Sequence, residues 1–181
     1  MIEVYIGKIP EKIEPELLRE LLRHVSVEKS RKLPDLLSIL VRSIICRKLQ
    51  LKNSEINFSN NLYGKPHLCN ATDFQFNVSH SGEWIACAVD KDQIGVDIEK
   101  IEPIDSISIS ERFFSSEEYN NLLIKNRNER LAYFYELWTM EESYIKVVGK
   151  GLAIPLHSVA VKRYRQNYME IEEVNSHIQY Y

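Results

Sequence analysis

Two acidic residues, Asp97 and Glu99, are separated by one residue in the stretch QIGVDIEK. Apolar residues alternate with polar ones there, at Ile94, Val96 and Ile98. This alternation is typical of a β-strand, and successive side chains of a strand point to opposite faces. Both carboxylates are therefore predicted to share one face, with Cα atoms roughly 6.5–7 Å apart. Two interpretations stay open, a solvated strand face or a pair of oxygen ligands for a divalent cation.

A third acidic residue, Glu142, lies in a long predicted helix that runs from about Asn128 to Val148. Trp138, Glu142 and Lys146 are spaced four apart and share one face of that helix. Apolar side chains occupy most of its circumference, so we expect a largely buried helix in which an unpaired carboxylate is costly. A cation or Lys146 would relieve that cost, and an exposed Glu142–Lys146 pair is the alternative.

Two short stretches could bind phosphate oxygens. NVSHSG places Ser79 and His80 at the end of a predicted strand, and YGKP presents Lys65 on a turn. Hydroxyl, imidazole and amide donors of such segments can contact phosphate, and small neighbours let a ligand approach the backbone. For each residue taken alone, a structural or solvated role is the alternative.

The elements that must position these residues follow the order βαα-βββ-αα-ββ, which predicts an α+β fold. Three of the strands, at 74–78, 84–89 and 94–99, are expected to form an antiparallel meander, with HSG joining the first two. Ser115 or Ser116 is expected to cap a helix, and Gly149 to end the long one. The remaining predicted segments are strands 2–7, 55–59, 157–164 and 167–174 and helices 15–32 and 34–49.

Composition limits the classes of function. The chain has 181 residues, of which 44% are hydrophobic and 27% charged, with a formal net charge of −3. This balance argues against a dominant nucleic-acid surface. No segment approaches the roughly 20 apolar residues of a membrane span. The three cysteines form no CxxC pair and are expected to be free thiols, so we predict a cytoplasmic protein without nucleic-acid or membrane partners.

Five segments, taken in chain order, carry a family resemblance. YGKP, FNVSHSGEW, IGVDIEK, RFFSSEE and LWTMEESYIKVVGKGL resemble the 4′-phosphopantetheinyl transferases of the surfactin-synthetase-activating type. The resemblance covers about residues 60–155 and, more loosely, LVRSIICRKL. It implies two similar α+β lobes, at 1–100 and 101–181, with the active site at their interface. The implied reaction is the Mg²⁺-dependent transfer of 4′-phosphopantetheine from coenzyme A to a serine of an apo acyl or peptidyl carrier protein, which releases adenosine 3′,5′-bisphosphate.

The resemblance also implies roles for individual residues. Asp97, Glu99 and Glu142 would hold Mg²⁺ against the pyrophosphate of coenzyme A, and Lys146 would contact its phosphate. Glu142 is also the candidate base for the carrier serine. Trp138 is expected to support the core and not to touch substrate.

Further residues are expected to bind coenzyme A. Lys65, Ser79 and His80 match positions that grip it, with His80 near the 3′-phosphate. The segment that usually binds the adenosine end is too short here, so Arg31 and Lys32 are expected to replace it only in part.

Two departures from the family pattern give further expectations. Glu141 stands where a lysine is common, and is expected to add negative charge beside the phosphate site. The chain also stops earlier than longer relatives, in a shortened C-terminal lobe. One expectation is a minimal active enzyme, either a monomer or a homo-oligomer formed through the shortened C-terminal sheet. The alternative is a degenerate relative that binds carrier proteins with little or no transfer.

Overall fold

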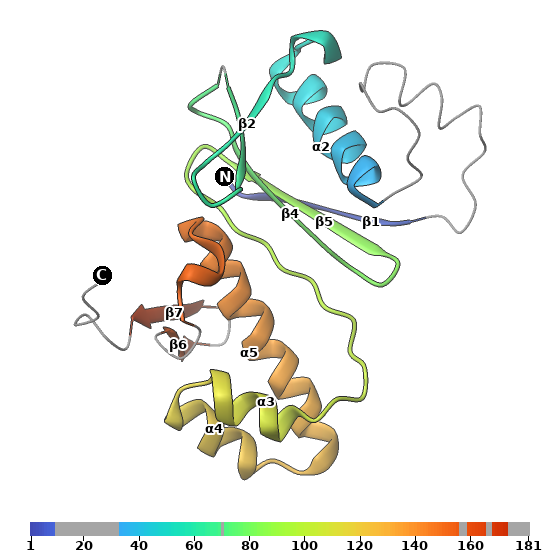
Figure 1. Cartoon of the computed structure of the whole chain (residues 1–181). Coiled ribbons are helices and arrows are strands. Elements are labelled where there is room, and N and C mark those ends of the chain that lie inside the picture. Colours follow the sequence, from blue (N-terminus) through green and yellow to red (C-terminus); the bar gives the residue numbers. More distant parts are fainter. Residues whose placement is uncertain (10–32, 70, 156–158, 166–167, 174–181) are drawn as a thin grey trace.

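The computed structural model describes residues 1–9, 33–69, 71–155, 159–165 and 168–173 (Figure 1). Its helices and antiparallel sheets confirm the predicted α+β class. The predicted helix 15–32 lies outside the described residues, and so do Arg31 and Lys32.

A three-stranded antiparallel sheet positions half of the candidate site. Its strands are β1 (Glu3–Lys8), β4 (Gln75–Ser81) and β5 (Trp84–Asp90), in the order β1-β5-β4. Ser81 pairs with Trp84, so the β4–β5 turn is the dipeptide Gly82-Glu83, and Gly82 has the positive φ of +56° that suits a tight hairpin. His80 and Ser81 therefore belong to β4, and the prediction that HSG joins the two strands was wrong.

The expected third strand of the meander is also absent, because residues 93–100 form an extended segment without strand pairing. Asn77 and Ser81 hold this segment through their side chains. The Asn77 Oδ1 accepts the Val96 N–H at 2.9 Å, and the Ser81 Oγ accepts the Lys100 N–H at 2.9 Å. Asn77 and Ser81 are alternate residues of β4 and therefore share one face of the sheet, so the segment crosses that face. The other edge of β5 is paired with β1.

Helix α2 (Leu33–Leu49) lies over the sheet, and α5 (Arg127–Val148) extends away from its opposite side (Figure 1). The predicted helix 34–49 is confirmed as α2, which covers one face and packs its apolar residues against β4 and β5. Residues 93–100 and helix α5 lie on the other side. The short hairpin of β2 (Phe58–Asn60) and β3 (Pro66–Leu68), preceded by a 3-10 turn at Asn53–Glu55, completes this region. The buried cluster includes Val41, Ile44, Ile45, Phe76, Cys87 and Val89.

A second buried cluster forms around the other end of α5. Phe114, Leu122, Phe134 and Leu137 are its buried members, contributed by α4 (Ser116–Leu123), α5 and the α3–α4 junction. Trp138 stacks on Phe134 with ring centroids 5.6 Å apart, which places it in this core as expected. Strands β6 (Val159–Arg165) and β7 (Tyr168–Glu173) follow a 3-10 turn at Gly151–Ala153 and confirm the two predicted C-terminal strands.

Local signals explain where these helices begin and end. Ser115 caps α4 in a capping box with Glu118, and Gly149 ends α5 in the left-handed conformation, as predicted. Helix α3 (Ser106–Phe113) was not predicted, because its ISIS stretch alternates like a strand. Its signal is Asp105, whose carboxylate accepts the Ser108 N–H. The division into lobes at residue 100 stays a prediction.

The described helices include none that combines the length and the apolar character needed to cross a membrane.

Candidate functional site

Asp97 lies at the centre of the candidate site. Its side chain is only 4% exposed, and its Oδ1 accepts hydrogen bonds from the Ser79 Oγ at 2.8 Å and the Lys146 Nζ at 2.6 Å. The Lys146 ammonium also donates to the Ser79 Oγ at 2.9 Å and to the Val96 carbonyl at 3.2 Å. Residues far apart in sequence, from β4, the 93–100 segment and α5, thus meet at one carboxylate.

Glu99 lies on the same side of the segment as Asp97. The Ser81 Oγ donates to its Oε2 at 2.7 Å, just as Ser79 donates to Asp97. The alternation predicted for a strand therefore holds in the extended segment. Glu99 is solvent-exposed, in contrast to Asp97.

Glu142 faces these two carboxylates from α5. Glu142 is half-buried, and this burial is the main cause that raises the pKa of its carboxyl. Repulsion from Asp97 and, more weakly, from Glu99 raises the pKa further, whereas the Lys146 ammonium lowers it. The alternative interpretation, an exposed Glu142–Lys146 pair, is not found, because in the described residues the ion pair of Lys146 is with Asp97. The structure thus brings the helical acid to the same region as the two acids of the segment.

Gly95 sets how closely the segment approaches α5. A Cβ atom at this position would lie 2.0 Å from the Ser143 carbonyl oxygen and 2.7 Å from the Val147 nitrogen. Such distances are far inside van der Waals contact, so a residue without a side chain is required. The glycine of the GVDIE motif therefore allows a close backbone contact between the two acid-bearing elements.

The acidic residues do not form a ready-made metal site. In the part of the chain that the structure describes, no three His, Cys, Asp or Glu side chains are close enough to hold a metal ion. The Oδ2 of Asp97 is nevertheless buried without a hydrogen-bond partner there, and burying an unpaired carboxylate oxygen is costly. The carboxylates of Asp97, Glu99 and Glu142 and the ammonium of Lys146 together carry a formal charge of −2. The donor set therefore fits a hard divalent cation such as Mg²⁺.

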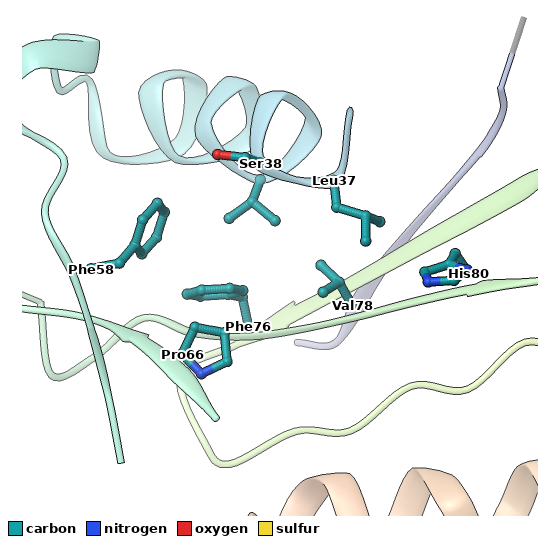
Figure 2. Close-up of a pocket in the computed structure, with 8 residues that line it drawn as sticks. Leu37, Ser38, Phe58, Pro66, Phe76, Val78 and His80 are labelled. Atoms are coloured by element: carbon teal, nitrogen blue, oxygen red, sulfur yellow. The ribbon is translucent and has the colours of Figure 1, made fainter. Parts of the chain in front are cut away.

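His80 and Ser79 point to opposite faces of the sheet, as neighbours in a strand must. Ser79 contacts Asp97 and Lys146, whereas His80 lines a cavity of about 280 Å³ between α2 and β4 (Figure 2). Since β4 is the edge strand of its sheet, the cavity and the acidic residues lie on either side of one edge. The cavity wall is almost entirely apolar and consists of Leu37, Ser38, Val41, Phe58, Pro66, Phe76, Val78 and His80.

Lys65 makes contacts that the sequence did not suggest. Its Nζ donates to the carbonyls of Val147 at 3.1 Å and Ile94 at 3.2 Å and to the Gln93 side chain at 3.3 Å. Burial lowers the pKa of this ammonium. Its predicted contact with coenzyme A stays a prediction.

Glu141 does not lie beside the phosphate site, and that expectation was wrong. Its side chain is fully buried, and its neighbour is Glu118, whose Oε1 accepts the Val161 N–H at 2.7 Å. Burial, followed by repulsion from Glu118 and Glu142, raises the pKa of Glu141 to about 9. The side chain is therefore protonated at neutral pH and adds no negative charge. The physical reason is the helix itself, since one residue turns it by about 100°.

The sequence analysis missed Asn61, Asn77 and Ser81, which hold the 93–100 segment and the end of α5 in place. The available signal was the alternation of Asn77, Ser79 and Ser81 in β4, which puts three polar side chains on one face of a strand.

Comparison with known proteins identifies the family of the chain. A family described as the 4′-phosphopantetheinyl transferase superfamily matches residues 93–180, and one described as 4′-phosphopantetheinyl transferase, N-terminal, matches residues 15–92. The chain is 37% identical over 188 residues to the 4′-phosphopantetheinyl transferase gsp of Aneurinibacillus migulanus, covering 94% of this chain and 78% of that protein. The chain belongs to the 4′-phosphopantetheinyl transferase superfamily.

Other members of the superfamily give the extent of the match. The 4′-phosphopantetheinyl transferase Sfp of Bacillus subtilis is 50% identical over 139 residues, which are 77% of this chain and 62% of that protein. A Xenopus laevis relative, the L-aminoadipate-semialdehyde dehydrogenase-phosphopantetheinyl transferase, is 36% identical over 134 residues, 67% of this chain and 44% of that protein. The chain thus spans 62% of the length of the Bacillus relative.

Proposed function

We propose that this protein transfers 4′-phosphopantetheine from coenzyme A to a serine hydroxyl of an apo acyl or peptidyl carrier protein and releases adenosine 3′,5′-bisphosphate. One observation carries the proposal. Asp97 and Glu99 on one element and Glu142 and Lys146 on another meet beside the strand edge that leads to the His80 cavity. The transferase names of the relatives support the same chemistry.

Phosphoryl transfer requires positioning and charge stabilisation more than covalent chemistry by the protein. Asp97, Glu99 and Glu142 are the residues that would hold Mg²⁺, which supplies charge neutralisation at the pyrophosphate when bound. The Lys146 ammonium, 2.6 Å from the Asp97 Oδ1, supplies a further positive charge for phosphate oxygens.

In the transfer step, the serine oxygen forms a bond to the phosphorus of the phosphopantetheine arm. The bond from that phosphorus to the oxygen of the leaving adenosine bisphosphate breaks, and the oxygen keeps the electron pair. The serine proton passes to a base, for which Glu142 is our candidate. Glu142 is a carboxylate of α5 that lies near Asp97, and a carboxylate in this region can accept the proton.

The cavity beside α2 would receive the adenine end of coenzyme A. Phe58, Phe76 and Pro66 offer flat apolar surfaces, and its volume is near the lower end for small-molecule pockets, about 300 Å³. His80 at this cavity would reach the 3′-phosphate, and the pyrophosphate would pass around the edge of β4 toward Lys146. Arg31 and Lys32 remain candidates for the same end of the ligand.

The second candidate is a relative that binds carrier proteins without transferring the arm. The position of the Lys146 ammonium on Asp97 favours it, because that contact occupies a carboxylate oxygen that a cation would need. A cytoplasmic location, the absence of nucleic-acid and membrane partners, and a monomer or homo-oligomer stay predictions.

Intact-mass measurement distinguishes the two candidates. An apo carrier protein incubated with coenzyme A, Mg²⁺ and this protein should gain the mass of the phosphopantetheinyl arm. Asp97→Asn and Glu142→Gln should each reduce the rate by at least about a thousandfold with an unchanged circular dichroism spectrum. Glu117→Gln, an exposed change on α4, is the control and should keep the full rate. No mass gain across acyl and peptidyl carriers, with carrier binding retained, would favour the second candidate.

A further inference from the structure

The turn between β2 and β3 is organised by one side chain, that of Asn61. Its Oδ1 accepts hydrogen bonds from the backbone N–H groups of Tyr63 and Lys65, both at 2.9 Å. The Asn61 N–H donates to the Lys65 carbonyl at 2.9 Å as well. Asparagine commonly fixes turns in this way, by binding the backbone a few residues ahead. The conformation of residues 61–65 is therefore set within the turn itself.

The same Asn61 side chain also reaches the end of α5. Its Nδ2 donates to the Gly149 carbonyl at 2.8 Å, and a Cβ on Gly149 would lie 3.2 Å from that nitrogen. The last carbonyls of a helix have no partner within the helix and must find donors elsewhere. Lys65 supplies a second donor, to the Val147 carbonyl at 3.1 Å. One turn of the N-terminal half thus caps α5.

Lys65 also ties the turn to the acid-bearing segment, because its Nζ donates to the Ile94 carbonyl at 3.2 Å. Ile94 precedes Gly95, the contact point with α5, and lies three residues before Asp97. Val147 directly follows Lys146, the partner of Asp97. The turn therefore touches both elements of the candidate site close to the residues that face each other.

We infer that Asn61 is a positioning residue, which fixes the turn so that Asn61 and Lys65 together hold the C-terminal end of α5 against the 93–100 segment. In this way Asn61 sets the placement of Glu142 and Lys146 relative to Asp97 and Glu99. The inference concerning metal binding and transfer rests on the proposed function, whereas the placement of the helix end does not.

Hydrogen exchange tests the placement without reference to activity. Asn61→Ala removes both the turn bonds and the bond to Gly149, and Asn61→Asp keeps the acceptor oxygen but removes the donor. The matched control is Asn60→Ala, since the exposed neighbour Asn60 makes no side-chain hydrogen bond in the described residues. Amides at the last turn of α5 should exchange about tenfold faster in Asn61→Ala, less so in Asn61→Asp, and at the wild-type rate in the control.

Metal affinity tests the link to the site. Calorimetric titration with Mn²⁺ in the presence of coenzyme A should show affinity weakened about fivefold in Asn61→Ala. In a Glu142→Gln background the same change should have little further effect, because the residue through which Asn61 acts is already altered. Simple destabilisation of the fold would instead lower the melting temperature without this non-additivity.

The outcomes separate the two proposals. If wild-type protein neither binds Mn²⁺ with coenzyme A nor transfers the arm, the proposed function fails, and faster exchange at the α5 end would still support the placement role. If wild-type protein is active while Asn61→Ala matches Asn60→Ala in exchange, affinity and rate, the inference is overturned and the function stands. If the amides at the end of α5 exchange faster in Asn61→Ala, but the effects of Asn61→Ala and Glu142→Gln on Mn²⁺ affinity are additive, Asn61 caps the helix without positioning Glu142, and the positioning role is overturned.

Discussion

The two faces of α5 hold neighbouring glutamates in contrasting environments. Glu142 faces the acids of the 93–100 segment and stays half-buried, whereas Glu141 is enclosed near Glu118 on the core side. Both carboxyls have a raised pKa, and burial is the largest cause for both. The two glutamates differ in their neighbours. Glu142 lies near charged residues that suit a cation, whereas Glu141 lies near the Glu118 carboxylate, which takes part in the capping box of α4.

This difference shows that one face of α5 contributes to the candidate site and the other face packs in the second buried cluster. Its site face approaches a backbone segment at Gly95, with no room for a side chain. Its core face packs on aromatic rings, including the stacked Phe114–Phe134 pair at 5.4 Å. We therefore expect changes on the site face to affect placement of the acids, and changes on the core face to affect mainly stability.

The largest effect is expected for Gly95→Ala on the site face. The new methyl group would need to displace the backbone of α5 at Ser143 and Val147, because the distances would be 2.0 and 2.7 Å. Stability should fall by about 3 kcal/mol or more, as for severe overpacking, and arm transfer should be lost. Urea unfolding and the mass assay measure the two effects.

Gly7→Ala is the matched control for this prediction. A Cβ at Gly7 would meet only the Ile85 side chain at 3.6 Å, an ordinary contact. Its stability should stay within about 1 kcal/mol of wild type. A Gly95→Ala protein as stable and active as Gly7→Ala would mean that the backbone of the segment does not contact α5 at Gly95.

The contrast also shows what the sequence can predict. The helix of 128–148, its glycine end and the Ser115 cap follow from local rules and are confirmed. The 93–100 segment was predicted as a strand because its alternation is real, yet its partners are the side chains of Asn77 and Ser81 and not a backbone ladder. Periodicity predicts which side chains share a face, but not what that face meets.

The same limit applies to the candidate site. The family resemblance implied that Asp97, Glu99 and Glu142 meet, and the structure brings Glu142 close enough to Asp97 and Glu99 for their charges to raise its pKa. The buried position of Glu141 depends on how α5 is rotated about its axis. Tertiary packing determines that rotation, and a helix that is apolar over most of its circumference carries little information about it.

A smaller effect is expected on the core face, where Glu141→Gln should change the pH dependence of stability. The pKa of Glu141 is about 9 in the folded protein, above the value of 4.5 expected for the unfolded chain. The contribution of the protonated Glu141 carboxyl to the free energy of unfolding is therefore fully present below pH 4.5 and is lost as pH rises toward 9. Glu118 and Glu142 are the charged groups that reinforce this loss. Removing the carboxyl should make the protein about 2–3 kcal/mol more stable at pH 6.5, two units above the unfolded pKa, and no more stable at pH 4.5.

Urea unfolding of wild type and Glu141→Gln across this pH range measures the effect. Glu117→Gln, on an exposed position of the neighbouring helix, should leave the pH profile unchanged. Equal slopes for wild type and Glu141→Gln would show that Glu141 is ionised in the folded protein, and the contrast between the two faces of α5 would then not hold.

The smallest effect concerns Lys146 on the site face, tested without coenzyme A. The Lys146 ammonium lies 2.6 Å from the Asp97 Oδ1, so it neutralises the carboxylate that a divalent cation would use. Lys146→Met removes the positive charge but keeps an apolar stem of similar length. Mn²⁺ should then bind about fivefold more tightly to the protein alone, because the lost competition outweighs any change in packing. Lys91→Met, at an exposed lysine, is the control and should leave the affinity unchanged. If Lys146→Met weakens Mn²⁺ binding instead, Lys146 organises Asp97 for the cation and does not compete with it, and the site face of α5 would be preformed.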